Sequence, residues 1–335
     1  MKFSKTSQIA LATGLALAAF GAQAQNSVKV YGLVDLSLGS VKDAGNGKTR
    51  QTVVDSGKMT TSYYGLSGSE DLGGGLSAQF KLESFMRSDT GEQGRFTGDT
   101  QFSRTASVGL SHPDYGTLNL GRNTTALFVS TLSFNAFGDS FGYSPSIRHY
   151  FSGGQNAVTG DSGWSDSIAY ASPSWNGLRF GLASAAKEGS NGGNWSANLG
   201  YGSGPLALAL VVQDVRKNNG DGTTPLDDTH TTQLNASYDF GVAKVFGQYG
   251  KVENHSTNID RDLTGLGVRV PAGPGALIAQ WGRNSPDTGA DRNTTSVGYL
   301  YPLSKLTELY GVAMHDKLDG QSSGSAYSAG MRLRF

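Results

Sequence analysis

The chain has 335 residues, with 27 basic and 27 acidic side chains, 48 glycines and no cysteine. A chain without cysteine has no disulfide framework, no cysteine-ligated zinc and no thiol nucleophile. A formal net charge of zero without a long basic run lacks the positive footprint that nucleic-acid binding requires, so we expect no nucleic-acid partner.

The first residues have the pattern of a secretory signal peptide. Lys2 and Lys5 precede an apolar run over 9–20, and an Ala-Gln-Ala cleavage site covers 22–24. We therefore expect a signal peptide over residues 1–24, cleaved near Ala24, and a mature domain over 25–335. The apolar run is shorter than the roughly 20 residues that a membrane-spanning helix needs, and no later segment approaches that length.

The remaining sequence alternates short stretches rich in Val, Leu, Phe, Tyr and Thr with clusters of Gly, Asp, Asn, Ser and Pro. This pattern is typical of strands and turns, whereas helical spacing of apolar residues is rare. Sixteen strands are predicted, over 27–38, 52–68, 76–85, 102–110, 117–122, 167–171, 178–185, 195–201, 206–215, 232–240, 243–252, 263–270, 276–283, 294–301, 307–315 and 327–335.

The predicted connections alternate between tight turns and long polar loops. Turns such as 70–75 and 112–116 are short and rich in Gly, Pro and Asp, whereas 87–101 and 216–230 are long. Short turns on one side and long loops on the other are typical of an up-and-down antiparallel barrel in an outer membrane. The sequence therefore predicts an all-β, 16-stranded antiparallel transmembrane β-barrel.

Alternation within the strands predicts which face meets lipid. In 206–213 and 233–240, one face is apolar and the other is small or polar. About sixteen strands enclose a lumen too wide for side chains to fill, so the apolar face should point outward and the polar face should line water. Aromatic residues near the short turns should form an interfacial girdle; they are Tyr238, Phe240, Tyr299, Tyr301 and Phe335.

The last predicted strand also alternates, and it ends on an aromatic residue. Tyr327, Met331 and Phe335 share one face, whereas Arg332 and Arg334 lie on the other. This strand resembles the C-terminal signature of outer-membrane proteins, which implies recognition by the barrel-insertion machinery through Phe335. Outer-membrane lipid is the expected surrounding.

Several segments resemble the general diffusion porins of Gram-negative outer membranes, of betaproteobacterial type. The resemblance covers nearly the whole mature chain and is strongest over 27–35, 65–76, 104–110 and 116–122. It implies a homotrimer of barrels, passive transport of small hydrophilic solutes and ions, and a third loop that folds into the lumen. That loop should be 123–163, whose length of about 40 residues far exceeds the usual connection.

The resemblance also implies a constriction, in which acids on the third loop face a ladder of basic side chains on the opposite wall. Arg104 matches one member of that ladder, and Asp139 is the acid on the aromatic part of the loop. Strand parity adds further lumen residues, which are Lys29, Asp35, Lys81, Glu83 and Arg179. The resemblance implies arginine at two positions where this chain has Tyr63 and Ala169, so we expect fewer basic side chains in the ladder. Arg148 and His149 on the loop could take their place. Counting these charges leaves the ion preference open.

Small or polar residues that we place outward on the first strands are expected to form the subunit interface; they are Gly32, Ser103, Thr105, Ser107 and Gly109. No cofactor, metal site or catalytic residue is expected, because the five histidines are scattered among turns, loops and strand ends. Two other roles remain open. A substrate-specific channel would use inner aromatics such as Tyr31, Tyr63 and Phe85, and an adhesive or structural barrel would carry no solute.

Overall fold

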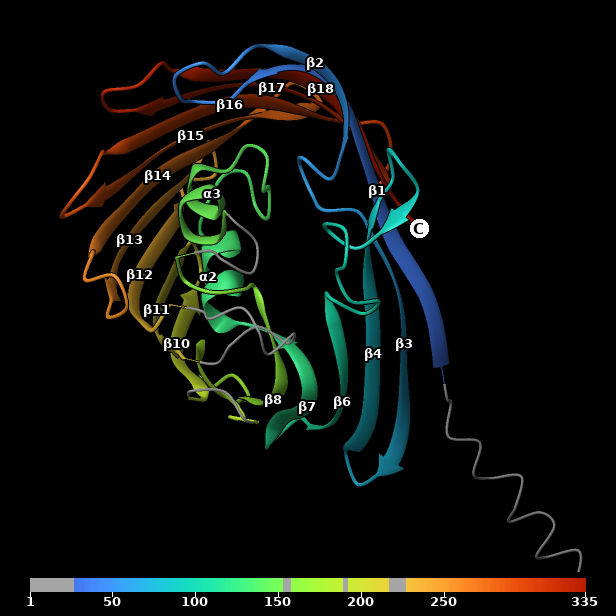
Figure 1. Ribbon diagram of the computed structural model, residues 1–335. Coiled ribbons are helices and arrows are strands. Elements are labelled where there is room, and N and C mark those ends of the chain that lie inside the picture. The colour runs from blue at the N-terminus through green and yellow to red at the C-terminus, as the bar shows by residue number, and fades with distance from the viewer. Residues whose placement is uncertain (1–26, 153–157, 189–191, 217–226) are drawn as a thin grey trace, which may run out of the picture.

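The computed structural model describes residues 27–152, 158–188, 192–216 and 227–335. The expected signal peptide, residues 1–24, and part of the loop predicted over 216–230 lie outside the described residues. Figure 1 shows a sheet that curls round on itself, with the helical segment on its inner side.

Antiparallel strands make up nearly the whole wall, and the two helices lie in one connection, α2 (Ala126–Ser133) and α3 (Pro145–Phe151). The strands are β1 (Ser27–Lys42), β2 (Gln51–Ser56), β3 (Tyr63–Gly73), β4 (Leu76–Arg87), β5 (Glu92–Gln93), β6 (Thr105–His112), β7 (Gly116–Thr124), β8 (Gly163–Ala171), β9 (Leu178–Ala185), β10 (Asn194–Ser203), β11 (Leu206–Val215), β12 (Thr229–Asp239), β13 (Lys244–Asn254), β14 (Arg261–Ala272), β15 (Gly275–Pro286), β16 (Arg292–Pro302), β17 (Thr307–Leu318) and β18 (Gly324–Arg334).

These strands occupy sixteen positions in a closed wall, as predicted. The pair β5 belongs to the loop after β4, and β2 and β3 both pair with the same edge of β1, so together they fill one position. Pairing of β1 with β18 closes the barrel. Closure satisfies backbone groups that would otherwise cost several kcal/mol each in hydrocarbon.

The second wall position is interrupted, which the sequence did not predict. Residues 57–62 separate β2 from β3 and leave the ladder. Gly57 begins the departure with φ +71°, a conformation that side-chain-bearing residues rarely adopt. The continuous strand predicted over 52–68 is therefore wrong at its centre.

Outward and inward faces follow the predicted alternation over most of the wall. Leu208, Leu210 and Leu234 are exposed on the outer face, whereas Gln213 and Gln233 are buried on the inner one. Tyr238, Phe240, Tyr301 and Phe335 are exposed beside the short turns, and Tyr299 is half-buried. In the part of the chain that the structure describes, no helix has the length and hydropathy needed to cross a membrane.

The predicted faces of β6 are wrong. Val108 and Leu110 are 57% and 46% exposed on the outer face, so the residues that alternate with them point inward. Thr105 and Ser107 line an inner hollow with Lys29. Arg104 and its neighbour Thr105 both reach the inner side, so the alternation is broken where β6 begins. Counting faces from Arg104 therefore exchanges the two faces of the strand, because a shift of one residue is enough to do so. Of the expected interface residues, Gly32 keeps its outward position, whereas Ser103, Thr105, Ser107 and Gly109 do not form an outward patch.

The inverted polarity of the barrel predicts opposite outcomes for two neighbouring residues of β10. Leu199 is 46% exposed on the outer face, and Asn198 points to the inner hollow beside Arg179. Leu199→Lys should lower the free energy of unfolding in lipid vesicles by about 2–4 kcal/mol, because the ammonium group meets acyl chains. Asn198→Lys should lower the free energy of unfolding by well under half of that amount, because its ammonium group meets water. Equal losses in urea titrations would contradict the assigned faces.

Candidate functional site

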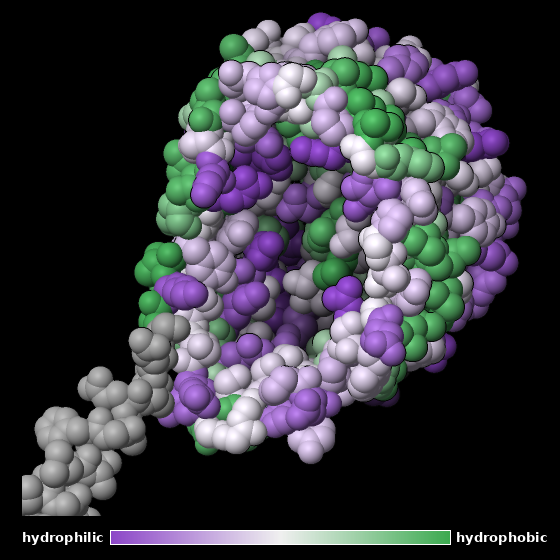
Figure 2. Space-filling view, turned by 180° about the vertical axis from the view of Figure 1, so that it is seen from behind, coloured by the Kyte–Doolittle hydropathy of each residue, from purple (hydrophilic) through white to green (hydrophobic). Residues whose placement is uncertain are grey.

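The inner wall and the segment packed on it form the candidate site. Figure 2 shows a hollow centre lined mostly by hydrophilic residues, while hydrophobic residues cover much of the outer flank. The segment between β7 and β8 carries both helices, and Thr125 and Ser144 cap their N-termini through bonds to the amides of Phe128 and Ile147. These local caps let two short helices form inside a sheet protein.

Polar side chains of the wall hold this segment. Gln233 and Asn235 of β12 donate to the hydroxyls of Thr131 and Ser130, each at 2.8 Å. Farther round the wall, Gln280 donates to Ser146 and the hydroxyl of Ser296 donates to the carbonyl of Tyr143. Each of these wall residues lies on a face opposite the exposed leucines, so the contacts place α2 and α3 on the inner side (Figure 1).

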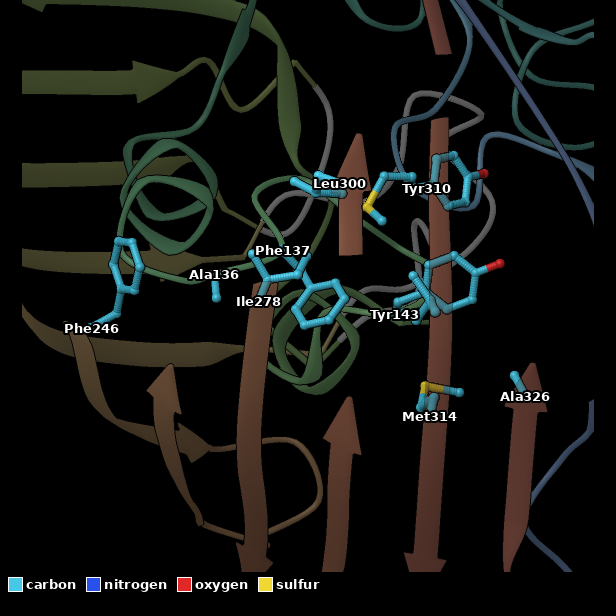
Figure 3. Packing of buried hydrophobic residues seen from close by; sticks show 11 residues of the cluster. Ala136, Phe137, Tyr143, Phe246, Ile278, Leu300, Tyr310, Met314 and Ala326 are labelled. Atoms are coloured by element: carbon cyan, nitrogen blue, oxygen red, sulfur yellow. The ribbon is translucent and has the colours of Figure 1, made fainter. Parts of the chain in front are cut away.

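Apolar packing adds to these hydrogen bonds. Phe137 and Tyr143 of the segment cluster with wall residues Ile278, Tyr310 and Met314, as Figure 3 shows. A second cluster joins α2 and α3 to β11, β13 and β14 through Leu127, Ile147, Tyr150, Phe151, Val211, Val252 and Leu263. The predicted aromatic run of the loop is therefore packed rather than exposed.

The break in the second wall strand contacts the same segment. The carbonyl of Lys58 accepts bonds from the Ser140 hydroxyl at 2.7 Å and from the Gly142 amide at 3.0 Å. A Cβ on Gly142 would lie 2.7 Å from that carbonyl oxygen, so only glycine fits this approach. The Thr60 hydroxyl donates to Asp139, the predicted loop acid, at 3.0 Å.

Asp35 holds residues 57–62 in this position. Its carboxylate is fully buried and accepts the amides of Met59 and Thr60 at 2.7 Å each and the hydroxyl of Tyr310 at 2.6 Å. Asp35 lies on the inner side of the wall, where these bonds make it an anchor of residues 57–62 rather than a charge exposed to water.

Arg104 and Glu83 lie together on one wall. The Arg104 guanidinium is 2.5 Å from the Glu83 carboxylate and stacks over the Tyr63 ring at 4.1 Å, and Tyr31 donates to Glu83 at 2.7 Å. The stacking ring is that of Tyr63, where the resemblance to porins had led us to expect arginine. This pair is therefore nearly neutral, because each charge has its partner beside it.

Lys29, Lys81 and Arg179 face the interior, and none of them has an ion-pair partner among the residues that the structure describes. Lys29 and Lys81 line a hollow of about 480 Å³, and Arg179 lines another of about 630 Å³. Asp139 lines a third, of about 310 Å³, together with Lys244, Arg269 and Arg332. Lys244 and Arg269 were not among the expected site residues, although the alternation of the strands predicted over 243–252 and 263–270 could have placed them inward.

Arg148 and His149 do not replace the missing arginines as free charges. Arg148 pairs with Asp316, which also pairs with Arg292. His149 is 5% exposed and bonded to Thr294, and burial together with the nearby Arg292 and Arg148 lowers its pKa to about 3. A histidine with this pKa is uncharged at neutral pH.

A network of four charges, which the sequence did not reveal, joins two long loops. Arg95 bonds both Asp99 and Asp161, and Arg122 bonds Asp161 at 2.7 Å. Burial alone would raise the pKa of Asp161, but Arg95 and Arg122 lower it to about 2. The two guanidinium groups therefore keep Asp161 ionised and hold the loop after β4 against the end of the helical segment.

A model of the Gram-negative porin family matches residues 10–321. Outer membrane porin protein 32 of Delftia acidovorans is 32% identical over 328 residues, which cover 92% of this chain and 88% of that protein. The chain belongs to the Gram-negative porin family. An outer membrane porin protein of Bordetella pertussis is 29% identical, and the match covers 94% of this chain and 96% of that protein.

Solved porins share the fold. The anion-selective porin from Comamonas acidovorans aligns with a TM-score of 0.79 at 26% identity, over 92% of this chain and all of that chain. A trimer form of OmpT from Vibrio cholerae aligns with a TM-score of 0.68 at 17% identity, over 92% of this chain and 99% of that chain. At that identity the second likeness shows the fold alone.

In this porin, the loop network predicts a pH-dependent local stability. Because the folded pKa of Asp161 is about 2 and that of an unfolded aspartate is about 3.9, the network should be fully stabilising above pH 4 and lost as the pH falls through 2. Asp161→Asn should lower the free energy of local opening of residues 88–104 by about 3 kcal/mol, because it removes the carboxylate that two buried arginines share. Hydrogen exchange at neutral pH measures this change.

The exposed pair Arg283 and Asp291 provides the matched control. Asp291→Asn should leave local exchange nearly unchanged, because solvent screens this pair. Unchanged protection of 88–104 in Asp161→Asn would contradict the structural role of the buried network.

Proposed function

We propose that this porin forms a water-filled channel in the bacterial outer membrane, through which small hydrophilic solutes and ions diffuse passively. The observation that carries the proposal is the inverted polarity of the closed wall, with leucines outside and amides, hydroxyls and charges inside. Removal of residues 1–24 near Ala24 before insertion is part of the proposal, and the mass of the purified protein tests it.

We propose that α2, α3 and the intervening residues narrow this channel and that it prefers anions. Within the described residues, several inner cations have no ion-pair partner; they include Lys29, Lys81, Arg179, Lys244 and Arg269. The inner acids Asp35, Glu83 and Asp316 are bonded to neighbours, so the unpaired cations outnumber Asp139, whose carboxylate accepts a bond from Thr60. Unpaired charge of one sign in a low-dielectric tube raises the local concentration of the opposite ion. The likeness to a porin described as anion-selective supports the same preference.

A catalytic role receives less support than a channel. His230 is bonded to Asp214 and His149 to Thr294, and family membership favours transport. A substrate-specific channel built on Tyr31, Tyr63 and Phe85 is also less favoured, because Tyr31 and Tyr63 already contact Glu83 and Arg104. Swelling of proteoliposomes in small sugars tests transport itself, and its absence would favour an adhesive or structural barrel.

Ion preference is tested by the reversal potential of single channels under a KCl gradient. The parent protein should favour chloride. Arg104→Gln should shift the potential toward cation preference, because Glu83 loses its neutralising partner, and Glu83→Gln should shift it the opposite way. If both variants shifted the reversal potential in the same direction, the Arg104–Glu83 pair would not contribute to ion preference in the narrow section.

We propose a homotrimer whose contacts involve the first strands. Ser107 and Gly109 point inward and so do not support this interface. Support comes instead from a mostly apolar hollow of about 300 Å³ on the outer face, lined by Val28, Phe80 and Val108 among others. Val108→Lys should increase the fast-migrating species on unheated gels, because a charge enters the packed contact. Leu199→Lys is the control, and equal dissociation in both variants would contradict this interface.

A further inference from the structure

Three basic side chains meet on the outer face of the barrel, at the end that carries the long loops. Lys42 of β1 and His315 of β17 are both direct partners of Ser325 of β18, so they flank it on the neighbouring strands. Arg50, which precedes β2, reaches across β1 and donates to the hydroxyls of Ser40 and Ser325. We call Lys42, Arg50 and His315 the seam cluster, because they lie across the pairing that closes the barrel.

The register of the strands places the seam cluster at the edge of the lipid-facing surface. Tyr327 is exposed on the outer face and is the direct partner of Ser40, and Ser325 lies two residues nearer the long loops. The Arg50 guanidinium lies 5.6 Å from the centre of the Tyr327 ring. An outward aromatic residue near the end of a barrel strand marks the level of the lipid headgroups, so the seam cluster lies at that level.

The two cations of the seam cluster have no ion-pair partner in the part of the chain that the structure describes. Three other cations of the same outer rim are each paired with a nearby acid; the pairs are Lys251 with Glu253, Arg283 with Asp291, and Lys317 with Asp319. Arg50 is held instead by hydroxyls and a carbonyl, which leave its charge unbalanced. Like charges on neighbouring strands destabilise a sheet, so an anion bound here would stabilise it.

The surface next to the seam cluster, on the side of the short turns, is apolar and free of charge. Leu38 is the direct partner of both Val54 and Ala329, and all three are exposed on the outer face. The outer hollow that we assign to subunit contacts lies elsewhere, near Val28 at the other end of β1. A molecule with an anionic head and an apolar body therefore fits this part of the outer face.

We propose that the seam cluster binds a lipid whose headgroup carries a phosphate monoester, in the leaflet that meets the long loops. The phosphate lies between Lys42, Arg50 and His315, and an acyl chain lies against Leu38 and Val54. A phosphate monoester carries a charge of about −1.5 to −2, which two cations balance. Arginine offers phosphate two parallel N–H donors, and lysine adds a charge-assisted bond.

The bound lipid has a structural consequence for the barrel. Arg50 already joins Ser40 of β1 to Ser325 of β18, and a phosphate shared with Lys42 and His315 extends this bridge to β17. The lipid should therefore stabilise the seam at which the barrel closes. This role belongs to the outer surface and is independent of the proposed passage of solutes through the lumen.

Monophosphoryl lipid A is the probe for this site. Native mass spectrometry of the purified protein from dodecyl maltoside micelles should show saturable binding of one such lipid per chain. Dioleoyl phosphatidylcholine, whose headgroup has no net charge, should bind at least about tenfold more weakly. Equal binding of the two lipids would overturn the proposal. Displacement of the lipid by an equal concentration of inorganic phosphate would also overturn it, because a site for a free anion would then be sufficient.

Paired variants separate the seam cluster from the general charge of the rim. Lys42→Gln with Arg50→Gln should weaken binding of monophosphoryl lipid A by at least about tenfold, because both charge-assisted contacts are lost. Lys251→Gln with Arg283→Gln removes the same charge from the same rim and should change binding by less than about twofold, because each of these cations has an acidic partner. Equal weakening in both would overturn the site.

Thermal unfolding tests the effect on the seam. A saturating concentration of the lipid should raise the unfolding temperature of the parent protein, because the folded state alone binds it, and should raise that of the double variant much less. Equal rises would overturn the proposal. If the double variant fails to fold, Lys42→Gln alone should weaken lipid binding by a smaller factor, and unchanged binding in that folded variant would also overturn the site.

Discussion

Backbone hydrogen bonding is the constraint on which this structure depends. A strand surrounded by hydrocarbon has no water to satisfy its amides and carbonyls, so every edge must find a partner. The seam between β1 and β18 meets this need, and it continues to Phe335, whose amide and carbonyl exchange bonds with Gly32. The Phe335 ring also covers Gly32, where a Cβ would lie only 2.5 Å from it. The final residue therefore completes the wall.

Closure of the sheet determines which residues face outward. In the interior, acidic and basic side chains differ in whether they have bonded partners. Inner carboxylates hold backbone and side chains in place, as Asp35 does for residues 57–62 and Asp316 does for Arg148 and Arg292. Several inner cations have no ion-pair partner among the described residues. The acids that stabilise the packed segment thus contribute less to the field that a solute meets, which is the basis of the proposed preference for anions.

Most of the wall could be predicted from the sequence because strand periodicity is local. The alternation of β11 and β12 and the sixteen wall positions follow from short-range patterns. The assigned faces of β6 failed because they were counted from Arg104, where one irregularity reverses every later position, whereas the apolar Val108 and Leu110 mark the true outer face. The ionic contacts of Asp161 join residues 66 positions apart, which periodicity does not report. Lys244 and Arg269 could have been placed inward from strand alternation, whereas the packing of the loop on Ile278 and Tyr310 joins residues that are far apart in the sequence.

The interruption of the second wall strand joins the wall to the long loop through a single buried side chain. Met59 leaves the sheet there and packs with Phe137 and Tyr143, so part of the support of the loop is built from the wall itself. Because Met59 is 1% exposed, a smaller side chain at this position would leave a cavity between wall and loop. The loop could then shift against the wall while its own sequence and the barrel strands stay unchanged.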